Sequence, residues 1–120
     1  MDTPVMYGIP NCDTIKKTTD WLKRNKIEFR FHDYKKEGIT AARLKKWEAA
    51  AGWQTLLNTK GTTWRQLDEE TKAAVKNAGA AIRLMKEHTS LIKRPVIEAG
   101  DQVLVGFNED QLKQVFKSTK

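Results

Sequence analysis

The stretch YGIPNCDT, residues 7–14, decides how the chain is organised. It overlaps the apolar, β-branched run PVMYGI at residues 4–9, which predicts a buried strand. It leads into a polar stretch in which Ile15 and Leu22 fall on one face at helical spacing, with lysines on the other face. Cys12, the one cysteine of the chain, therefore stands where a strand passes into the N-terminus of a helix.

Two further stretches extend this unit into a sheet. IEFRFHDY, residues 27–34, alternates apolar and polar side chains and predicts a half-exposed strand, with Ile27, Phe29 and Phe31 on one face. Strand, helix and strand in this order imply a right-handed crossover between parallel strands. RPVIEAGDQVLVGF, residues 94–107, predicts a β-hairpin around an Ala-Gly-Asp-Gln turn.

Short helices fill the middle of the chain, at about residues 40–90. Thr40 and Asp68 are placed to cap two of them, and Asn108 is placed to cap a final helix. The order β-α-β, helical block, β-β-α predicts an α/β protein. With the helical block treated as an insertion, the remaining elements are those of a thioredoxin-like fold. We see no linker and no repeat, and we expect residues 1–120 to form a single domain.

Composition restricts the class of protein. Hydrophobic residues make up 39% and charged residues 31%, which suits a globular protein with a well-solvated surface. No apolar run approaches the roughly 18 residues that a membrane span needs, and the start has no signal layout, so we expect a cytoplasmic protein without membrane contact. The formal charge of +7 comes from basic residues scattered among acids, which argues against a nucleic-acid partner. Two histidines and one cysteine do not predict a metal site.

Cys12 is a candidate nucleophile because of its place at a helix N-terminus. Unpaired backbone N–H groups and the positive end of the helix dipole favour a thiolate over a thiol. We therefore expect the pKa of Cys12 to lie below the free value of about 8.5. Lys16, one turn on, supports this shift, whereas Asp13 opposes it. A buried structural cysteine is the alternative interpretation.

LIKRPV, residues 91–96, is the second informative stretch. Pro95 lacks the backbone donor that a central strand needs, and the bond before a proline is where a cis peptide costs little. In thioredoxin-like folds a cis-proline loop faces the cysteine. We therefore predict a cis Arg94–Pro95 bond, with the Arg94 guanidinium beside Cys12 to stabilise a thiolate or hold an oxyanion. A surface arginine beside a trans proline is the alternative.

Four stretches, in order across nearly the full length, resemble the arsenate reductase (ArsC)/Spx family, most closely its YffB-like branch. They are YGIPNCDT, LLNTKGTTWRQL, LIKRPV and VGFNEDQL. The resemblance implies a thioredoxin-like fold with a helical insertion. It matches Cys12 to the nucleophile of the family and Arg94 to an oxyanion-binding arginine.

The chain departs from both well-defined branches of that family. Lys60 and Phe107 stand where the arsenate reductases carry two further arginines, and Gly8 stands where they carry a histidine. Lysine keeps the charge but loses bidentate geometry, and phenylalanine loses the charge, so arsenate is disfavoured as the substrate. The Spx regulators sense oxidants through a C-x-x-C pair, whose second position is Ile15 here.

The leading hypothesis is a glutathione-dependent thiol reductase with a single cysteine nucleophile. Cys12 would attack a small oxidised thiol or an oxyanion, and glutathione or a glutaredoxin would resolve the intermediate as an external partner. No metal and no tightly bound cofactor is implied. The catalytic residues would be Cys12 and Arg94, and the substrate would contact Asn11, Lys60, Arg65 and Pro95. The alternatives are an Spx-like regulator that binds RNA polymerase or another protein, and an arsenate reductase.

Overall fold

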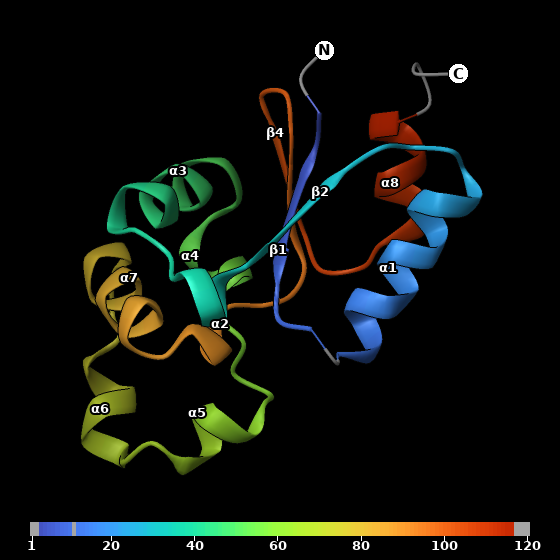
Figure 1. The fold of residues 1–120 in the computed structure, drawn as a ribbon. Coiled ribbons are helices and arrows are strands. Elements are labelled where there is room, and N and C mark those ends of the chain that lie inside the picture. Colours follow the sequence, from blue (N-terminus) through green and yellow to red (C-terminus); the bar gives the residue numbers. More distant parts are fainter. Residues whose placement is uncertain (1–2, 11, 117–120) are drawn as a thin grey trace. The chain divides into compact units, whose positions relative to one another are not determined.

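The structure, a computed structural model, describes residues 3–10 and 12–116 and contains a four-stranded sheet of order β2-β1-β3-β4 (Figure 1). The strands are β1 (Val5–Gly8), β2 (Arg30–Asp33), β3 (Val96–Ala99) and β4 (Gln102–Val105). β1 pairs parallel with β2 and antiparallel with β3, and β3 pairs antiparallel with β4. The parallel pair confirms the predicted crossover. The antiparallel β3–β4 pair confirms the predicted hairpin, with Gly100 at the positive φ of 60° that its turn requires.

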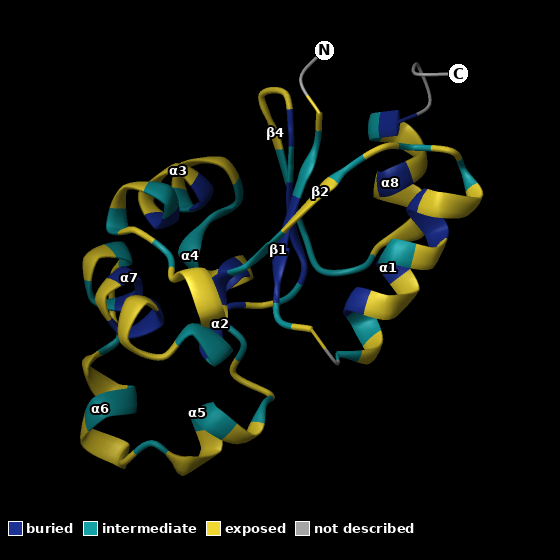
Figure 2. Cartoon of the chain, in the orientation of Figure 1, coloured by how far each residue is buried: buried dark blue, intermediate teal, exposed yellow. Residues whose placement is uncertain are grey.

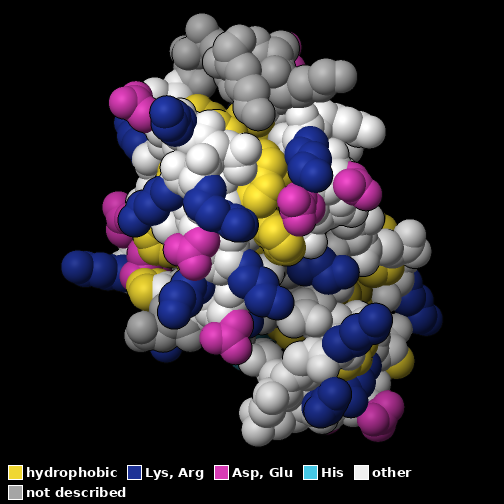
Figure 3. Space-filling model, turned by 90° about the vertical axis from the view of Figure 1, so that its right-hand side faces the viewer, with side chains coloured by type: hydrophobic (Ala, Val, Ile, Leu, Met, Phe, Trp, Pro, Cys, Tyr) yellow, Lys and Arg dark blue, Asp and Glu magenta, His cyan; other side chains and the backbone are white. Residues whose placement is uncertain are grey.

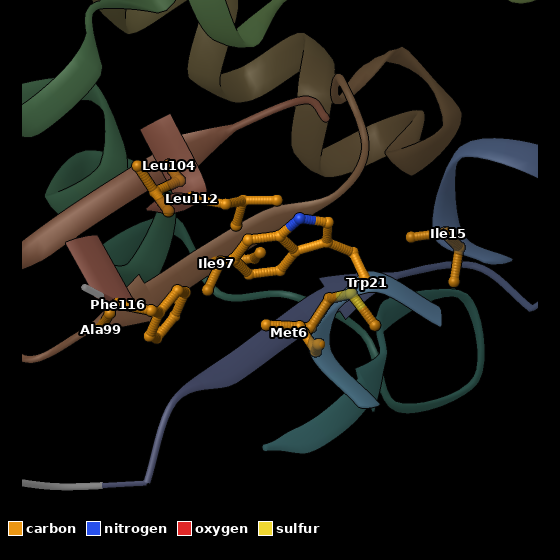
Figure 4. Close-up of a cluster of buried hydrophobic side chains, with 9 residues drawn as sticks. Met6, Ile15, Trp21, Ile97, Ala99, Leu104, Leu112 and Phe116 are labelled. Atoms are coloured by element: carbon orange, nitrogen blue, oxygen red, sulfur yellow. The ribbon is translucent and has the colours of Figure 1, made fainter. Parts of the chain in front are cut away.

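Two helices, α1 (Asp13–Arg24) and α8 (Glu109–Phe116), contribute to one hydrophobic core with the sheet (Figure 4). Trp21 of α1 and Phe116 of α8 lie with ring centroids 6.5 Å apart. Asn108 caps α8, as predicted, by accepting a hydrogen bond from Gln111 N–H at 3.1 Å. The buried members of this core cluster are Met6, Ile15, Trp21, Leu22, Ile97, Ala99, Leu104, Leu112 and Phe116.

Helix α1 forms because its apolar residues share one stripe. Ile15, Trp21 and Leu22 are buried, and exposed positions lie between them along the helix (Figure 2). Thr18 is buried as well, and its hydroxyl donates to the Thr14 carbonyl at 2.8 Å, so no polar group is left unsatisfied there. The stripe fixes the rotation of α1 about its axis, and with it the direction in which the first turn presents its N–H groups.

The chain divides into two compact units, Met1–Glu37 with Arg94–Lys120, and Gly38–Lys93. The second unit spans the range of the expected helical insertion. Thr40 caps its first helix by accepting from Arg43 N–H at 3.1 Å, and Asp68 caps another by accepting from Thr71 N–H at 2.7 Å, as predicted. Its helices are α3 (Ala41–Ala51), α4 (Trp53–Leu56), α5 (Thr62–Gln66), α6 (Glu69–Ala74), α7 (Ala78–Glu87) and the short 3₁₀ helix η1 (Thr89–Leu91).

The elements β-α-β and β-β-α of the first unit make an α/β, thioredoxin-like fold, as predicted from their order. Among the described residues, no helix has the length and apolar character needed to cross a membrane.

The second strand is shorter than predicted. β2 covers Arg30–Asp33 only, and Tyr34 begins a one-turn helix, α2 (Tyr34–Glu37), instead of ending the strand. Phe31 pairs with Met6 and so lies on the face of the core cluster, yet 38% of its surface is exposed. The reason is that β2 is an edge strand, where the core covers a side chain on one flank only. The alternation predicted the face on which Phe31 lies, and it made no statement about how far Phe31 is buried.

Gly8, the last residue of β1, has no room for a side chain. A Cβ there would overlap Ile15 Cδ1 and lie 3.2 Å from Ile15 Cγ1. Ile15 is itself only 7% exposed and belongs to the core cluster, so it has little freedom to move away. The strand end and the first turn of α1 are therefore fitted to one another at this point.

We predict that Gly8→Ala lowers the free energy of unfolding by about 1–3 kcal/mol, because the new methyl group overpacks the core. Ile15→Val removes the Cδ1 atom and should cost about 0.5–1.5 kcal/mol alone. In the double variant the overlap with Cδ1 is absent, so its loss should be smaller than the sum of the two single losses. Urea unfolding of the four proteins measures this coupling, and strictly additive losses would contradict the proposed contact.

Candidate active site

Three chain segments meet at one edge of the sheet. The carboxyl ends of the parallel strands β1 and β2 lie at the same edge, and the antiparallel strand β3 begins there. Cys12 follows β1, Tyr34 follows β2 and Arg94 precedes β3. The strand pairing thus brings together three side chains that are widely spaced in the sequence, all within the first unit.

Cys12 is the N-cap residue of α1, with extended backbone angles (φ −113°, ψ 130°). Its carbonyl accepts the first helical hydrogen bond from Lys16 N–H at 3.0 Å. The thiol is free and half-buried, packed at the margin of the core cluster. Cys12 therefore has the position that the sequence predicted, held by the backbone of both the strand end and the helix start.

The surroundings of Cys12 lower the pKa of its thiol. Burial alone would raise it, but the N–H of Ile15, a hydrogen bond from Arg94, the N–H of Thr14 and the charge of Arg94 together outweigh burial. The sulfur makes no cap hydrogen bond of standard geometry, so these N–H groups act on it as partial positive charges at the helix N-terminus. The lowered pKa agrees with the prediction and increases the share of thiolate, which is the nucleophilic form.

Arg94 lies in the loop that enters β3, and the Arg94–Pro95 bond is cis, as predicted. Pro95 is buried, and its carbonyl accepts a hydrogen bond from Gly106 N–H at 2.8 Å, which ties the loop to the hairpin. The guanidinium is hydrogen-bonded to Cys12 and to Tyr34. Burial alone would lower the pKa of Arg94, but these two contacts raise it, so the group stays charged.

Tyr34 is a member of this site that the sequence analysis missed. It is 1% exposed, and it is hydrogen-bonded to Arg94. Burial is the main reason that the pKa of its phenol is raised, so Tyr34 is neutral at physiological pH. The alternating pattern of residues 27–34 suggested only a strand residue. A signal was present in the Asp-Tyr-Lys-Lys sequence, because Asp33 is a good helix cap and so marks the end of the strand.

The substrate-binding roles expected of Lys60, Arg65 and Asn11 stay predictions. Lys60 and Arg65 are exposed, and both belong to the unit Gly38–Lys93, whereas Cys12 belongs to the other unit. Asn11 lies outside the described residues. Phe107 is half-buried and packs against the core cluster, as an apolar side chain in place of an arginine.

Charges of both signs are mixed on the face that Figure 3 shows, where Lys and Arg side chains lie among Asp and Glu. A groove beside α1 has the same character, since it is lined by Lys17, Lys23 and Arg24 together with Asp20 and Glu109. In the part of the chain that the structure describes, no cluster of three or more His, Cys, Asp or Glu side chains is arranged to hold a metal ion.

Comparisons with known proteins identify the family of the chain. The ArsC family model matches residues 7–115. A solved structure of a protein called YffB is 49% identical, covers 94% of this chain and 98% of its own, and superimposes with a TM-score of 0.90. An arsenate reductase (ArsC) related protein from Brucella melitensis is 42% identical, with 97% and 96% coverage and a TM-score of 0.75.

A regulator is also among the relatives. The global transcriptional regulator Spx of Streptococcus pneumoniae is 23% identical over 110 residues, which are 90% of this chain and 81% of that protein. Similarity of sequence thus extends over proteins named for different activities, and the chemistry of the site has to decide between them.

We predict that the rate of Cys12 alkylation by iodoacetamide, measured against pH, has its midpoint below the ordinary thiol value of about 8.5. Arg94→Gln should raise that midpoint by roughly one unit, because it removes both the charge and the hydrogen bond that stabilise the thiolate. Arg24→Gln is the matched control: it removes the same charge from the exposed end of α1 and should leave the midpoint in place. An equal shift in both variants would show that net charge, not contact, sets the pKa.

Proposed function

We propose that this chain, which belongs to the ArsC family and resembles its YffB-like branch, is a glutathione-dependent thiol reductase with Cys12 as its nucleophile. The observation that carries the proposal is the Arg94 guanidinium on the Cys12 sulfur at a helix N-terminus, where the thiolate is favoured. A cysteine kept only for packing gains nothing from a half-buried positive charge beside its sulfur, whereas a nucleophile does.

The reaction runs in two exchange steps. In a disulfide between glutathione and a second thiol, the Cys12 thiolate attacks the glutathione sulfur, forms a mixed disulfide with it and releases the other sulfur as a thiolate, which takes a proton from water. A glutathione thiolate then attacks the mixed disulfide and releases Cys12 as a thiolate. Two electrons have passed from thiols to the substrate. The second thiol has to come from outside because the chain has one cysteine.

Arg94 serves both steps through its charge. It stabilises Cys12 as the attacking thiolate in the first step and as the leaving thiolate in the second. The N–H groups of the first turn of α1 add to this, since they favour negative charge at the same place. The expected anion-binding roles of Lys60 and Arg65, and a contact of the substrate with Asn11 and Pro95, belong to this proposal.

The activity is tested with a small mixed disulfide of glutathione, with oxidised glutathione measured as product by a coupled glutathione reductase assay. We expect turnover by the native protein and loss of turnover in Cys12→Ser, because a hydroxyl does not replace a thiolate as nucleophile. Mass spectrometry of the protein under limiting glutathione should show one added glutathione on Cys12. Turnover by Cys12→Ser at the native rate would overturn the mechanism.

A regulatory protein that binds RNA polymerase or another protein is the candidate from a different class, and the relationship to Spx supports it. A C-x-x-C redox switch of the kind found in the Spx regulators is not available to it, because Ile15 replaces the second cysteine. The two proposals differ in what they demand of Cys12. A reductase requires its thiolate for turnover, whereas a binding protein retains its partner after Cys12→Ser.

Arsenate reductase is the narrower alternative, and two positions disfavour it. A tetrahedral oxyanion is held best by several guanidinium groups, each with paired donors. Lys60 lacks the paired geometry, and Phe107 offers an apolar surface packed on the core cluster. Each weakened charge-assisted hydrogen bond costs ~1.5–3 kcal/mol, or roughly one to two orders of magnitude in affinity.

We predict that arsenate reduction by the native chain is weak, and that Lys60→Arg raises it by supplying a second fork of donors. Lys60 is exposed, so this change should not disturb the fold. Lys86→Arg, at an exposed position of α7, is the control. Phe107→Arg is less suitable because it removes an apolar side chain from the edge of the core. Efficient arsenate turnover by the unmodified protein would contradict the prediction.

A further inference from the structure

The backbone on both sides of Tyr34 is fixed by hydrogen bonds, although this residue lies outside the sequence motifs. Asp33 ends β2, and its Oδ1 accepts hydrogen bonds from the N–H groups of Lys35 at 3.0 Å and Lys36 at 3.2 Å. These bonds cap the helix turn that Tyr34 begins. The backbone at Tyr34 is therefore fixed on one side by the strand and on the other by the cap, and its ring is buried.

The guanidinium of Arg94 connects Tyr34 to Cys12. It is planar and carries five N–H donors that point in fixed directions, so one group can donate to two acceptors that lie apart. Arg94 is hydrogen-bonded both to the Cys12 sulfur and to Tyr34. Since arginine has no acceptor atom, the phenol oxygen must be the acceptor in its bond with Tyr34.

We propose that Tyr34 is a positioning residue for the nucleophile: its phenol oxygen accepts a hydrogen bond from Arg94 and so holds the guanidinium against the Cys12 sulfur. The proposal rests on the proposed function only in taking Cys12 as the reactive group. An arginine side chain has four rotatable bonds, and in a half-buried loop it needs a second fixed contact to stay on one target.

A phenol suits this task better than a carboxylate would. A carboxylate beside Arg94 would form an ion pair with it and weaken the field that the guanidinium exerts on the thiolate. The Tyr34 phenol is neutral, because burial and the nearby negative groups Cys12 and Asp33 outweigh the effect of Arg94 on its pKa. Tyr34 thus orients the positive charge without cancelling it, and the charge remains available to Cys12.

The rival interpretation is that Tyr34 acts on the thiolate directly, as a hydrogen-bond donor to the sulfur. The hydroxyl proton of Tyr34 takes no part in the bond from Arg94, because the phenol oxygen is the acceptor there. The two interpretations differ in what happens once the arginine is gone. A residue that acts through Arg94 loses its effect in an Arg94→Gln background, whereas a direct donor keeps it.

The test is the pH midpoint of Cys12 alkylation in wild type, Tyr34→Phe, Arg94→Gln and the double variant. Midpoints are compared rather than single rates, because a thiolate of higher pKa is also a better nucleophile. We expect Tyr34→Phe to raise the midpoint by roughly half to one unit, which lowers the thiolate fraction below the midpoint roughly three- to tenfold. In the Arg94→Gln background, Tyr34→Phe should produce no further shift.

Tyr7→Phe is the matched control. Tyr7 is also buried, in β1, but its ring lies against His32, with centroids 4.9 Å apart. It loses the same hydroxyl and should leave the midpoint unchanged. If Tyr34→Phe does not fold, as judged by circular dichroism, Tyr34→Met removes the acceptor with a more adaptable side chain.

Three results would overturn the proposal: no shift in a folded Tyr34 variant, the same shift in both arginine backgrounds, or an equal shift in Tyr7→Phe. The measurement needs no physiological substrate, since it follows only the thiol. A failed glutathione assay with the expected midpoints would therefore overturn the proposed function and leave the role of Tyr34 in place.

Discussion

The pairing of β1 with a parallel strand on one side and an antiparallel strand on the other is the constraint on which the site depends. Backbone hydrogen bonds on both flanks fix the register, and a slip of one residue would turn every side chain of β1 to the other face. With this register, the end of β1, the end of β2 and the start of β3 share one edge. The chemistry of Cys12 depends on this arrangement, because Tyr34 follows β2 and Arg94 precedes β3.

Several contributions together lower the pKa of Cys12 against the opposing effect of burial. Burial disfavours a charge on Cys12, and any one of its neighbours would be a modest compensation. The helix N–H groups and the guanidinium act at the same sulfur, so their effects combine. The neutral phenol of Tyr34 adds no negative charge beside Arg94. A site of this kind favours reversible sulfur chemistry, in which the same thiolate has to attack and later to leave.

The sequence was sufficient for those features that depend on local chemistry. The caps at Thr40, Asp68 and Asn108 and the cis bond before Pro95 were predicted because each is encoded in a few adjacent residues. The place of Tyr34 in the site was not predicted, because its partner Arg94 is distant in the sequence and only the sheet brings them together. The exposure of Phe31 could not be predicted for a related reason: alternation predicts the face of a strand, and only the strand order tells which strand lies at the edge.

The unit that holds Cys12 is made from the two ends of the chain, with Gly38–Lys93 in between. During synthesis, Cys12 therefore emerges from the ribosome well before Arg94. Until Arg94 has been synthesised and β3 has paired with β1, Cys12 lacks the main side-chain contact that favours its ionisation. Without that contact a smaller share of the thiol is ionised, so we expect it to react more slowly with oxidants and disulfides. The reactivity of the Cys12 sulfur therefore depends on completed folding of this unit.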